Sequence, residues 1–107
     1  VEDIARWAHI LFKGNVIKQE SVQRMRQFVA ITGTGATWTG YGLGIQRYSA
    51  NGIELWGHSG SISGSSSLMV YSPLLDISIA LVDNDHGANH FGTVLAILPF
   101  LQSNLNQ

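Results

Sequence analysis

Residues 41–83 read YGLGIQRYSANGIELWGHSGSISGSSSLMVYSPLLDISIALVD, and this stretch decides the fold. Apolar side chains recur at every second position on both sides of Asn51-Gly52, a pair that is typical of tight β-hairpin turns. The alternating apolar positions are Leu43, Ile45, Ile53 and Leu55. The pattern therefore predicts two antiparallel strands joined at this turn.

Two further strands are expected after this hairpin. Leu68 to Tyr71 is the third, and Pro73 ends it because proline cannot donate a hydrogen bond to a neighbouring strand. Residues 76–83 are nearly all apolar, which indicates a fourth strand buried on both faces. The strand that follows Gly60 would present unpaired backbone groups at an open edge, so we look for function there.

Helical spacing flanks these strands on both sides. An apolar stripe with the helical period predicts a helix over residues 3–13, and a shorter stripe predicts a second helix over residues 19–29. A third helix is expected after Gly87, and Pro99 should kink or shorten it. The three stripes are Ile4, Trp7, Ala8, Leu11 and Phe12; then Val22, Met25 and Val29; then Phe91, Val94, Leu95, Leu98 and Leu101. The expected fold class is α+β, an antiparallel meander covered by N-terminal and C-terminal helices.

Composition limits the classes of function. The chain is 45% hydrophobic and 12% charged, which is typical of a packed globular protein with part of its surface covered by more protein. Lys and Arg are scattered, so nucleic acid is not an expected partner. There are no cysteines, and the apolar stretches are far shorter than the roughly 20 residues that span a bilayer. The chain opens on Val1 directly into a helical pattern, which suggests a start part-way through a longer protein.

Most of the candidate chemistry lies in Trp56-Gly57-His58-Ser59-Gly60-Ser61. Its context is Tyr41-Gly42-Leu43-Gly44 before it, and Gly64-Ser65-Ser66 and Val82-Asp83-Asn84 after it. Together these segments resemble the penicillin-binding-protein and class C β-lactamase group of serine hydrolases, whose third motif is Lys or His, Thr or Ser, then Gly. The resemblance covers residues 1–107 and implies the C-terminal segment of the β-lactamase/transpeptidase-like fold.

The resemblance also implies roles for the motif. His58 would stand where the family has its positive group and would help a neighbouring tyrosine or lysine to act as a base. Ser59 would bind the substrate's carboxylate, Gly60 would leave room for substrate, and the Ser61 backbone N–H would be an oxyanion donor. Substrate would lie along residues 60–64 as an added strand. The family implies a D-alanyl peptide, β-lactam or ester substrate, no cofactor, and an extracytoplasmic bacterial location.

Two motifs of that family are missing. The nucleophile lies in Ser-x-x-Lys, yet neither Lys13 nor Lys18 follows a serine by three positions. No tyrosine begins a Tyr-x-Asn motif, and Ser49-Ala50-Asn51 is interpreted as a turn. We therefore expect a fragment that is inactive alone and whose partner is the remainder of the parent hydrolase domain. Aminopeptidase, peptidase or esterase relatives are favoured over enzymes with Lys-Thr-Gly.

Other interpretations stay open beside this one. His86 and His90 have the i, i+4 spacing of a metal pair, but Gly87 and the surrounding Asp and Asn residues favour a connection that caps the last helix, so no metal is expected. The remaining serines, Ser63 and Ser65 to Ser67, are interpreted as a polar loop. The tryptophans Trp7, Trp38 and Trp56 are assigned to packing.

Two other functional classes compete with the family resemblance. Residues 57–61 nearly spell the Gly-x-Ser-x-Gly nucleophile elbow of α/β-hydrolases, but Ser61 replaces the last glycine and no helix is expected to follow. The alternative from a different class is a non-catalytic module that uses the open edge to bind a peptide or to self-associate.

Overall fold

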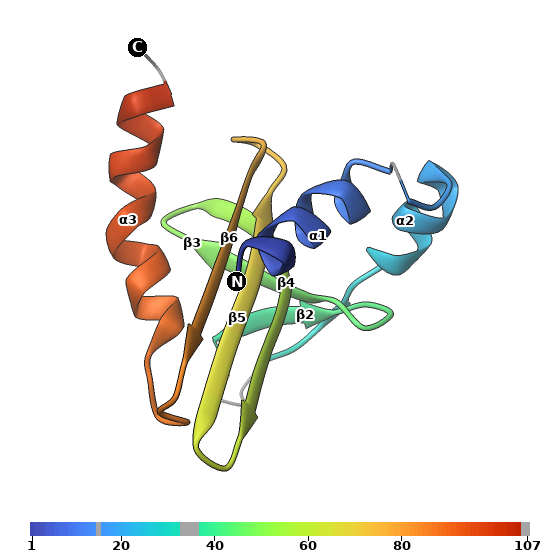
Figure 1. Ribbon diagram of the computed structural model, residues 1–107. Helices are drawn as coiled ribbons and strands as arrows, with labels where there is room; N and C mark the ends of the chain where they lie inside the picture. The colour runs from blue at the N-terminus through green and yellow to red at the C-terminus, as the bar shows by residue number, and fades with distance from the viewer. Residues whose placement is uncertain (15, 33–36, 106–107) are drawn as a thin grey trace.

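The chain forms one antiparallel sheet with helices on both faces, as a computed structural model that describes residues 1–14, 16–32 and 37–105 shows (Figure 1). Among the described residues the sheet has six strands in the order of the sequence, and each strand pairs antiparallel with the next. The strands are β1 (Val29–Ala30), β2 (Trp38–Tyr41), β3 (Gln46–Ala50), β4 (Ile53–Ile62), β5 (Ser65–Ser72) and β6 (Ile77–Asp83). The helices are α1 (Glu2–Phe12), α2 (Gln19–Met25) and α3 (His90–Leu105). The predicted α+β meander is confirmed.

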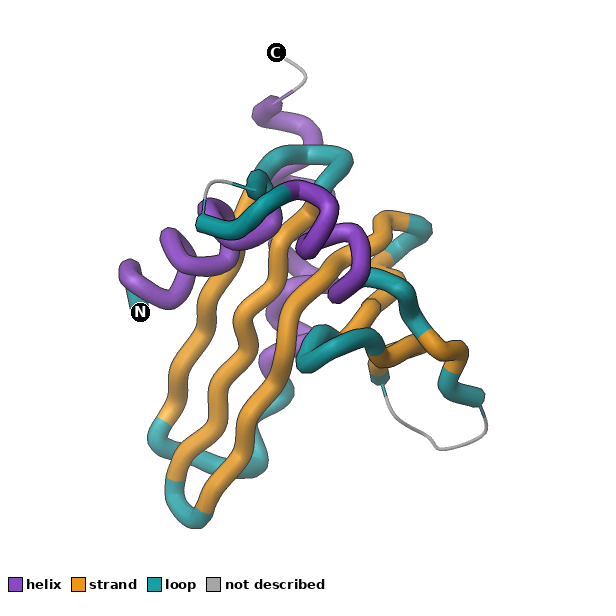
Figure 2. Tube along the Cα trace, turned by 90° about the vertical axis from the view of Figure 1, so that its right-hand side faces the viewer, coloured by secondary structure: helices purple, strands orange, loops and turns teal. Residues whose placement is uncertain are grey.

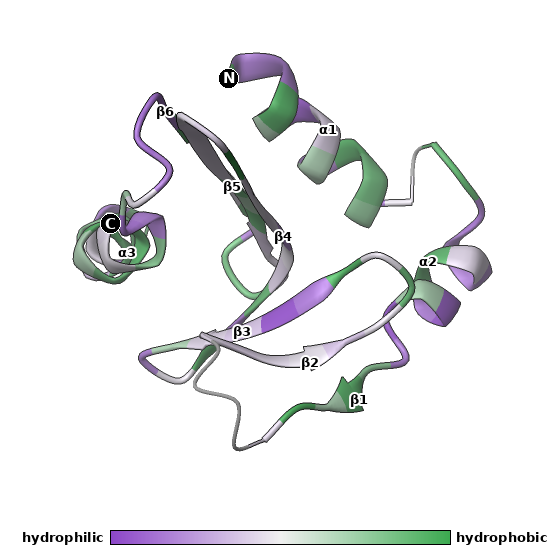
Figure 3. Cartoon of the chain, turned by 90° about the horizontal axis from the view of Figure 1, so that it is seen from below, coloured by the Kyte–Doolittle hydropathy of each residue, from purple (hydrophilic) through white to green (hydrophobic). Residues whose placement is uncertain are grey.

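The three layers enclose two separate apolar cores. Figure 3 shows α3 on one face of the sheet and α1 on the other. On the α3 face, Tyr48, Leu55 and Val70 pack with Leu98, and each is at most 1% exposed. The core on the face of α1 and α2 contains Ala8, Leu11, Phe12, Val22, Ile45, Trp56 and Tyr71. Both cores pack on the first half of β4, where Ile53, Leu55, Trp56 and Gly57 are buried, whereas residues 59–62, which follow His58, are exposed.

The helices follow the predicted stripes with three corrections. In α1, Ala8, Leu11 and Phe12 are buried, but Trp7 is 45% exposed and is therefore not a core residue of the described chain. The second helix was predicted to reach Val29 and ends at Met25, because Val29 instead pairs with Tyr41 in the sheet. The third helix continues through Pro99 to Leu105, so proline does not shorten it there.

The strands differ from prediction in three places. Leu43 and Ile45 lie in the connection between β2 and β3, which is closed by a hydrogen bond from Gly42 N to Ile45 O (2.8 Å). Ser65 to Ser67 lie in β5 and not in a loop, because each pairs with β4. The prediction that the fourth strand is buried on both faces is wrong: β6 is half-buried to exposed, since it is the last strand of the sheet.

Candidate active site

The β4–β5 hairpin extends beyond the end of β3 (Figure 2). Pairing between β3 and β4 runs from Ala50 with Ile53 to Gln46 with Gly57. From His58 to Ile62, β4 pairs with β5 on one side only. The edge of β4 that faces β3 has no strand partner over residues 58–62 in the described part of the chain. This edge carries the motif, as the sequence predicts, and we refer to it as the open edge.

The backbone N–H of Ser61 points toward the open edge. The Ser59 backbone N–H donates to Oε1 of Gln46 (2.8 Å), on the side of β4 that faces β3. Backbone N–H groups alternate between the two sides of a strand, so the Ser61 N–H points the same way as that of Ser59. Both amides therefore point toward the open edge, where the Ser59 amide already donates to Gln46 and the Ser61 amide faces the space that an added strand or substrate would occupy. At Gly60, a Cβ would meet only the Ser67 Oγ at 3.0 Å, so this position is bordered by one small side chain.

His58 is held in one tautomer by two contacts. Its Nδ1 contacts the Ser59 carbonyl oxygen (2.5 Å), and a carbonyl only accepts, so Nδ1 carries the proton. In the neutral ring Nε2 is then an acceptor, and the Tyr41 hydroxyl donates to it (3.0 Å). The two rings also meet edge to face, with centroids 5.8 Å apart. His58 thus accepts a hydrogen bond from a neighbouring tyrosine.

Ser59 and Ser61 lie on the opposite face of the sheet from His58, because side chains alternate along a strand. They line a cavity of about 270 Å³ together with Ser66, Tyr48 and residues at the start of α3. The Ser59 hydroxyl is 3.1 Å from Gln46 Oε1, which also accepts the Tyr48 hydroxyl. Burial raises the pKa of Tyr48, so this tyrosine stays protonated and able to donate.

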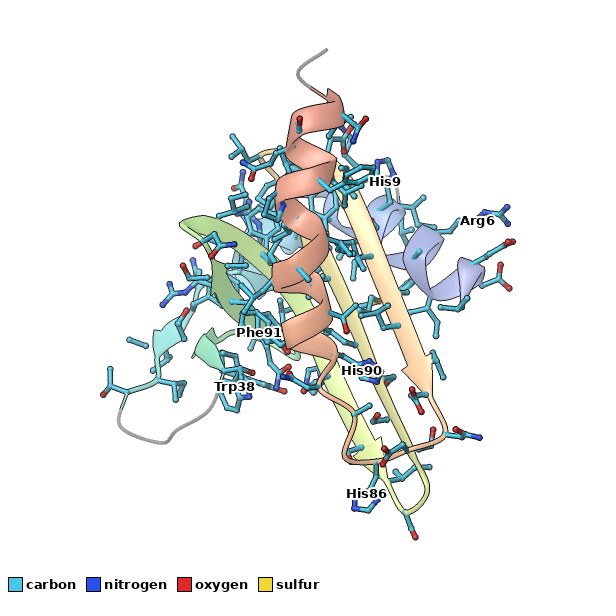
Figure 4. The ribbon with its side chains drawn as sticks, turned by 90° about the vertical axis from the view of Figure 1, so that its left-hand side faces the viewer. Arg6, His9, Trp38, His86, His90 and Phe91 are labelled. Carbon is cyan, nitrogen blue, oxygen red and sulfur yellow. The ribbon has the colours of Figure 1, made fainter. Side chains whose placement is uncertain are left out.

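The connection from β6 to α3 forms the other wall of the cavity. Ser61 Oγ donates to the His86 carbonyl oxygen (3.3 Å), and Ser66 Oγ donates to the Asp85 carbonyl oxygen (2.7 Å). His90 Nε2 is 2.9 Å from Ser66 Oγ. Figure 4 shows His86 and His90 on this connection, with His90 at the start of α3. The connection is therefore held against β4 and β5 by serine hydroxyls.

The four predicted site residues are consecutive on β4, so His58 and Gly60 lie on one face of the sheet and Ser59 and Ser61 on the other. Two partners were missed by sequence reasoning, Tyr41 on His58 and Gln46 on Ser59. Tyr41 begins the segment Tyr41-Gly42-Leu43-Gly44 that supported the family resemblance, but nothing in the sequence indicates its contact with His58. The hydroxyls of Ser65 and Ser66 bond backbone carbonyls, as expected, although both residues lie in a strand.

The two histidines with metal-like spacing do not form a continuous helical pair. His86 lies in the connection before α3, and His90 is its first residue. No group of three or more potential metal ligands exists among the residues that the structure describes. The expected cap is present, because Asn89 Oδ1 accepts from the Gly92 N–H (2.9 Å). His90 is instead a hydrogen-bond partner of β5.

Comparison with known proteins gives a family and a fold. The beta-lactamase family model matches residues 1–103. A D-stereospecific amidohydrolase from Streptomyces sp. superposes with a TM-score of 0.76 and 29% identity, over 90% of this chain and 28% of the amidohydrolase chain. The D-amino acid amidase from Ochrobactrum anthropi SV3, complexed with L-phenylalanine, gives 0.84 and 21% identity, over 96% and 31%. Comparison with curated protein sequences gave no match. The chain thus spans about a third of the solved structures it resembles.

Proposed function

Because this chain belongs to the β-lactamase family, we propose that it is the substrate-binding-strand part of an acyl-transfer serine hydrolase. The observation that carries the proposal is the open edge of β4, which presents His58, the Ser61 N–H and Gly60 together. An extended substrate would pair with residues 60–62 of this edge as an added strand, because residues 63 and 64, which the sequence-based expectation included, form the β4–β5 turn. The family match independently supports a hydrolase.

Each motif residue has a role in this proposal. The Ser61 N–H donates one hydrogen bond to the oxyanion of the tetrahedral intermediate, and a donor of this kind contributes about 10²–10³ in rate. His58 exchanges a proton with the tyrosine or lysine that activates the nucleophile. Gly60 lets the substrate backbone approach β4 closely, because no side chain projects there. Ser59 binds a polar group of the substrate, on the cavity side of the strand.

The nucleophile belongs to another part of the parent domain, since neither lysine of the chain stands in a Ser-x-x-Lys motif. These residues alone therefore bind substrate without turning it over. The substrate classes are those of the family resemblance: D-alanyl peptides, β-lactams or small esters. An extracytoplasmic location would suit those substrates. No helix in the described residues is long and apolar enough to cross a membrane.

Labelling with a fluorophosphonate probe tests this proposal, because the probe reacts with activated serines whatever the substrate preference. We expect labelling of the complete gene product and none of the 107-residue chain, with the adduct located by peptide mass outside these residues. In the complete product, His58→Ala should lower the labelling rate at least about 10²-fold, the low end of a lost acid–base contribution. Ser63→Ala, in the β4–β5 turn, is the matched control.

Other labelling outcomes would reject the proposal. Labelling of the short chain would place a nucleophile among its own serines, and attention would turn to Ser59 and Ser61. Absence of labelling in both proteins would favour a non-catalytic module that uses the open edge to bind an extended peptide. Equal labelling rates for His58→Ala and Ser63→Ala would show that His58 takes no part in activating the nucleophile.

A further inference from the structure

Gln46 is a buried polar side chain beside the open edge. It is 5% exposed and belongs to the last residue pair between β3 and β4, opposite Gly57. Its Oε1 accepts the Ser59 backbone N–H at 2.8 Å and the Tyr48 hydroxyl, and it lies 3.1 Å from the Ser59 hydroxyl. Because a backbone N–H only donates, this atom is the oxygen of the amide, and the orientation of the amide is fixed.

The nitrogen of the Gln46 amide has two protons to donate. Its hydrogen bonds to the described residues all involve Oε1, so none of those residues accepts a proton from Nε2. The fully enclosed side-chain atoms without a partner in the described part of the chain are Arg26 Nε and Ser78 Oγ, so Gln46 Nε2 can be reached from outside. Polar groups of buried side chains without a partner are rare in folded proteins. Nε2 is therefore a fixed donor whose acceptor has to come from elsewhere.

The Gln46 side chain takes the place of a β3 carbonyl. Backbone pairing between β3 and β4 ends at Gln46 and Gly57, so the Ser59 amide has no β3 carbonyl to bond and donates to Gln46 Oε1 instead. An added strand would therefore find the Ser59 amide occupied and the Ser61 amide available. Nε2 is bonded to the same carbon as Oε1, so it lies at the junction where β3 ends and the added strand would begin.

An extended substrate on this edge would bring a carbonyl oxygen to that junction. Carbonyls on one side of an extended chain recur at every second residue, as do the β4 amides that they bond. If one substrate carbonyl binds the Ser61 N–H, the next carbonyl on the same side lies opposite Ser59. The amide there is occupied, and the adjoining donor is Gln46 Nε2. Arg47 does not compete for this carbonyl, because it lies on the other face of β3 and bonds Thr39.

We propose that Gln46 is a substrate-binding residue of the parent hydrolase, and that its Nε2 donates to a second substrate carbonyl, two residues from the carbonyl that Ser61 binds. The inference rests on the proposed function, because it concerns the same edge of β4. It also defines the substrate class more narrowly, as extended chains long enough to present both carbonyls. A small ester with a single carbonyl would reach the Ser61 N–H but not Gln46.

Two matched probes test the inference on the 107-residue chain by NMR. N-acetyl-D-alanyl-D-alaninamide presents two carbonyls on the same side of an extended chain, and N-acetyl-D-alaninamide is one residue too short to do so. As each probe is added, we follow the Ser61 backbone amide signal and the side-chain NH2 signals of Gln46, which are assigned by their loss in Gln46→Glu. We expect the longer probe to shift both sets of signals. It should bind at least about fivefold more tightly than the shorter probe, the contribution of one further hydrogen bond.

Two variants connect the binding to the Gln46 donor. Gln46→Glu keeps an oxygen for Ser59 and Tyr48, but at about pH 8 the introduced carboxyl is ionised and only accepts. The longer probe should therefore bind this variant at least about fivefold more weakly, and the shorter probe should be less sensitive to the change. Gln23→Glu makes the same chemical change on the exposed surface of α2 and should alter neither affinity. Circular dichroism verifies that both variants are folded.

The inference would be overturned if the longer probe bound Gln46→Glu as tightly as the original chain, if it shifted the Ser61 signal without those of Gln46, or if neither probe shifted any of these signals. Such a result is separable from failure of the proposed function. Contact with Gln46 without serine labelling in the complete gene product would leave a peptide-binding edge and reject the hydrolase. Serine labelling with unmoved Gln46 signals would keep the hydrolase and reject the role of Gln46.

Discussion

Tyr41 and His58 form a hydrogen-bonded pair that joins β2 to β4 across the open end of the sheet. The Tyr41 hydroxyl donates to His58 Nε2 at 3.0 Å, while Nδ1 is held by the Ser59 carbonyl. We predict that Tyr41→Phe lowers the free energy of unfolding by about 1 kcal/mol, the net contribution of one such hydrogen bond. Urea titration measures this loss. Long-range proton–nitrogen NMR should also show that the variant no longer favours a single His58 tautomer. An unchanged tautomer would mean that the Ser59 carbonyl alone orients the ring.

Asp76 connects the β5–β6 turn to α1. It accepts hydrogen bonds from the Tyr71 hydroxyl (2.9 Å), His9 Nε2 (3.0 Å) and Lys13 Nζ (3.4 Å). The Tyr71 hydrogen bond, with the nearby Lys13 and His9, lowers the pKa of Asp76 from its ordinary 3.8. Burial, with the hydrogen bond to Asp76 and its charge, raises the pKa of Tyr71 to about 12.

The lowered Asp76 pKa predicts a loss of stability at acid pH, and the raised Tyr71 pKa predicts a loss of stability at alkaline pH. A lowered carboxyl pKa stabilises the fold above the unfolded value of 3.8, and that stability is lost as the pH falls below it. A raised phenol pKa stabilises the fold below 10.0, and that stability is lost as the pH rises through about 12. Asp76→Asn should remove the loss of stability at acid pH. It should reduce the loss of stability at alkaline pH only in part, because burial is the largest cause of the raised Tyr71 pKa. Denaturant unfolding across pH measures both limbs, and Glu20→Gln on the outer surface is the control.

At the scale of elements, the pairing of β4 with β5 depends on a glycine. A Cβ at Gly57 would lie 1.7 Å from the Met69 carbonyl oxygen, which is backbone and cannot move aside. A Cβ at Gly60 would meet only the Ser67 hydroxyl at 3.0 Å, which can rotate. We predict that Gly57→Ala costs about 3 kcal/mol through steric strain. Gly60→Ala should cost less than about 1 kcal/mol. Equal losses of stability for the two variants in thermal unfolding would contradict this account.

The elements that local patterns specify were predictable. Asn51 and Gly52 have φ angles of 54° and 82°, which the hairpin turn needs and this residue pair tolerates. The start of β5 was missed because Ser65 and Ser66 are poor strand formers in isolation. They are strand residues here because β4 and β6 pair with this strand on both sides. Pairing between distant segments overrides local preference, and no local pattern reports it.

The same distinction applies to the candidate site. His58, Ser59, Gly60 and Ser61 are contiguous, so a sequence motif is enough to identify them. The contacts of Tyr41 with His58 and of Ser66 with His90 join residues 17 and 24 positions apart. They depend on strand register and on the path of the connection into α3. Such contacts between distant segments therefore could not be inferred from sequence.

At the scale of the whole molecule, α1 leaves apolar surface uncovered. Ile4, Trp7 and Ile10 are 36%, 45% and 38% exposed, on the helix whose other side packs on the sheet. Burying such surface between two copies would remove it from water at about 25 cal/mol for each Å². We therefore predict that the 107-residue chain self-associates and that its sedimentation coefficient rises with concentration.

A pair of substitutions locates the contact. Ile10→Glu places a charge in the exposed face of α1 and should return the chain to a monomer at concentrations where the original associates. Phe100→Glu changes a side chain that is 69% exposed, on α3 at the opposite layer, and should leave the mass unchanged. A single monomeric mass for the original chain at every concentration would show that this surface is tolerated in water. If Phe100→Glu produced a monomer and Ile10→Glu did not, the copies would associate through α3 and not through α1.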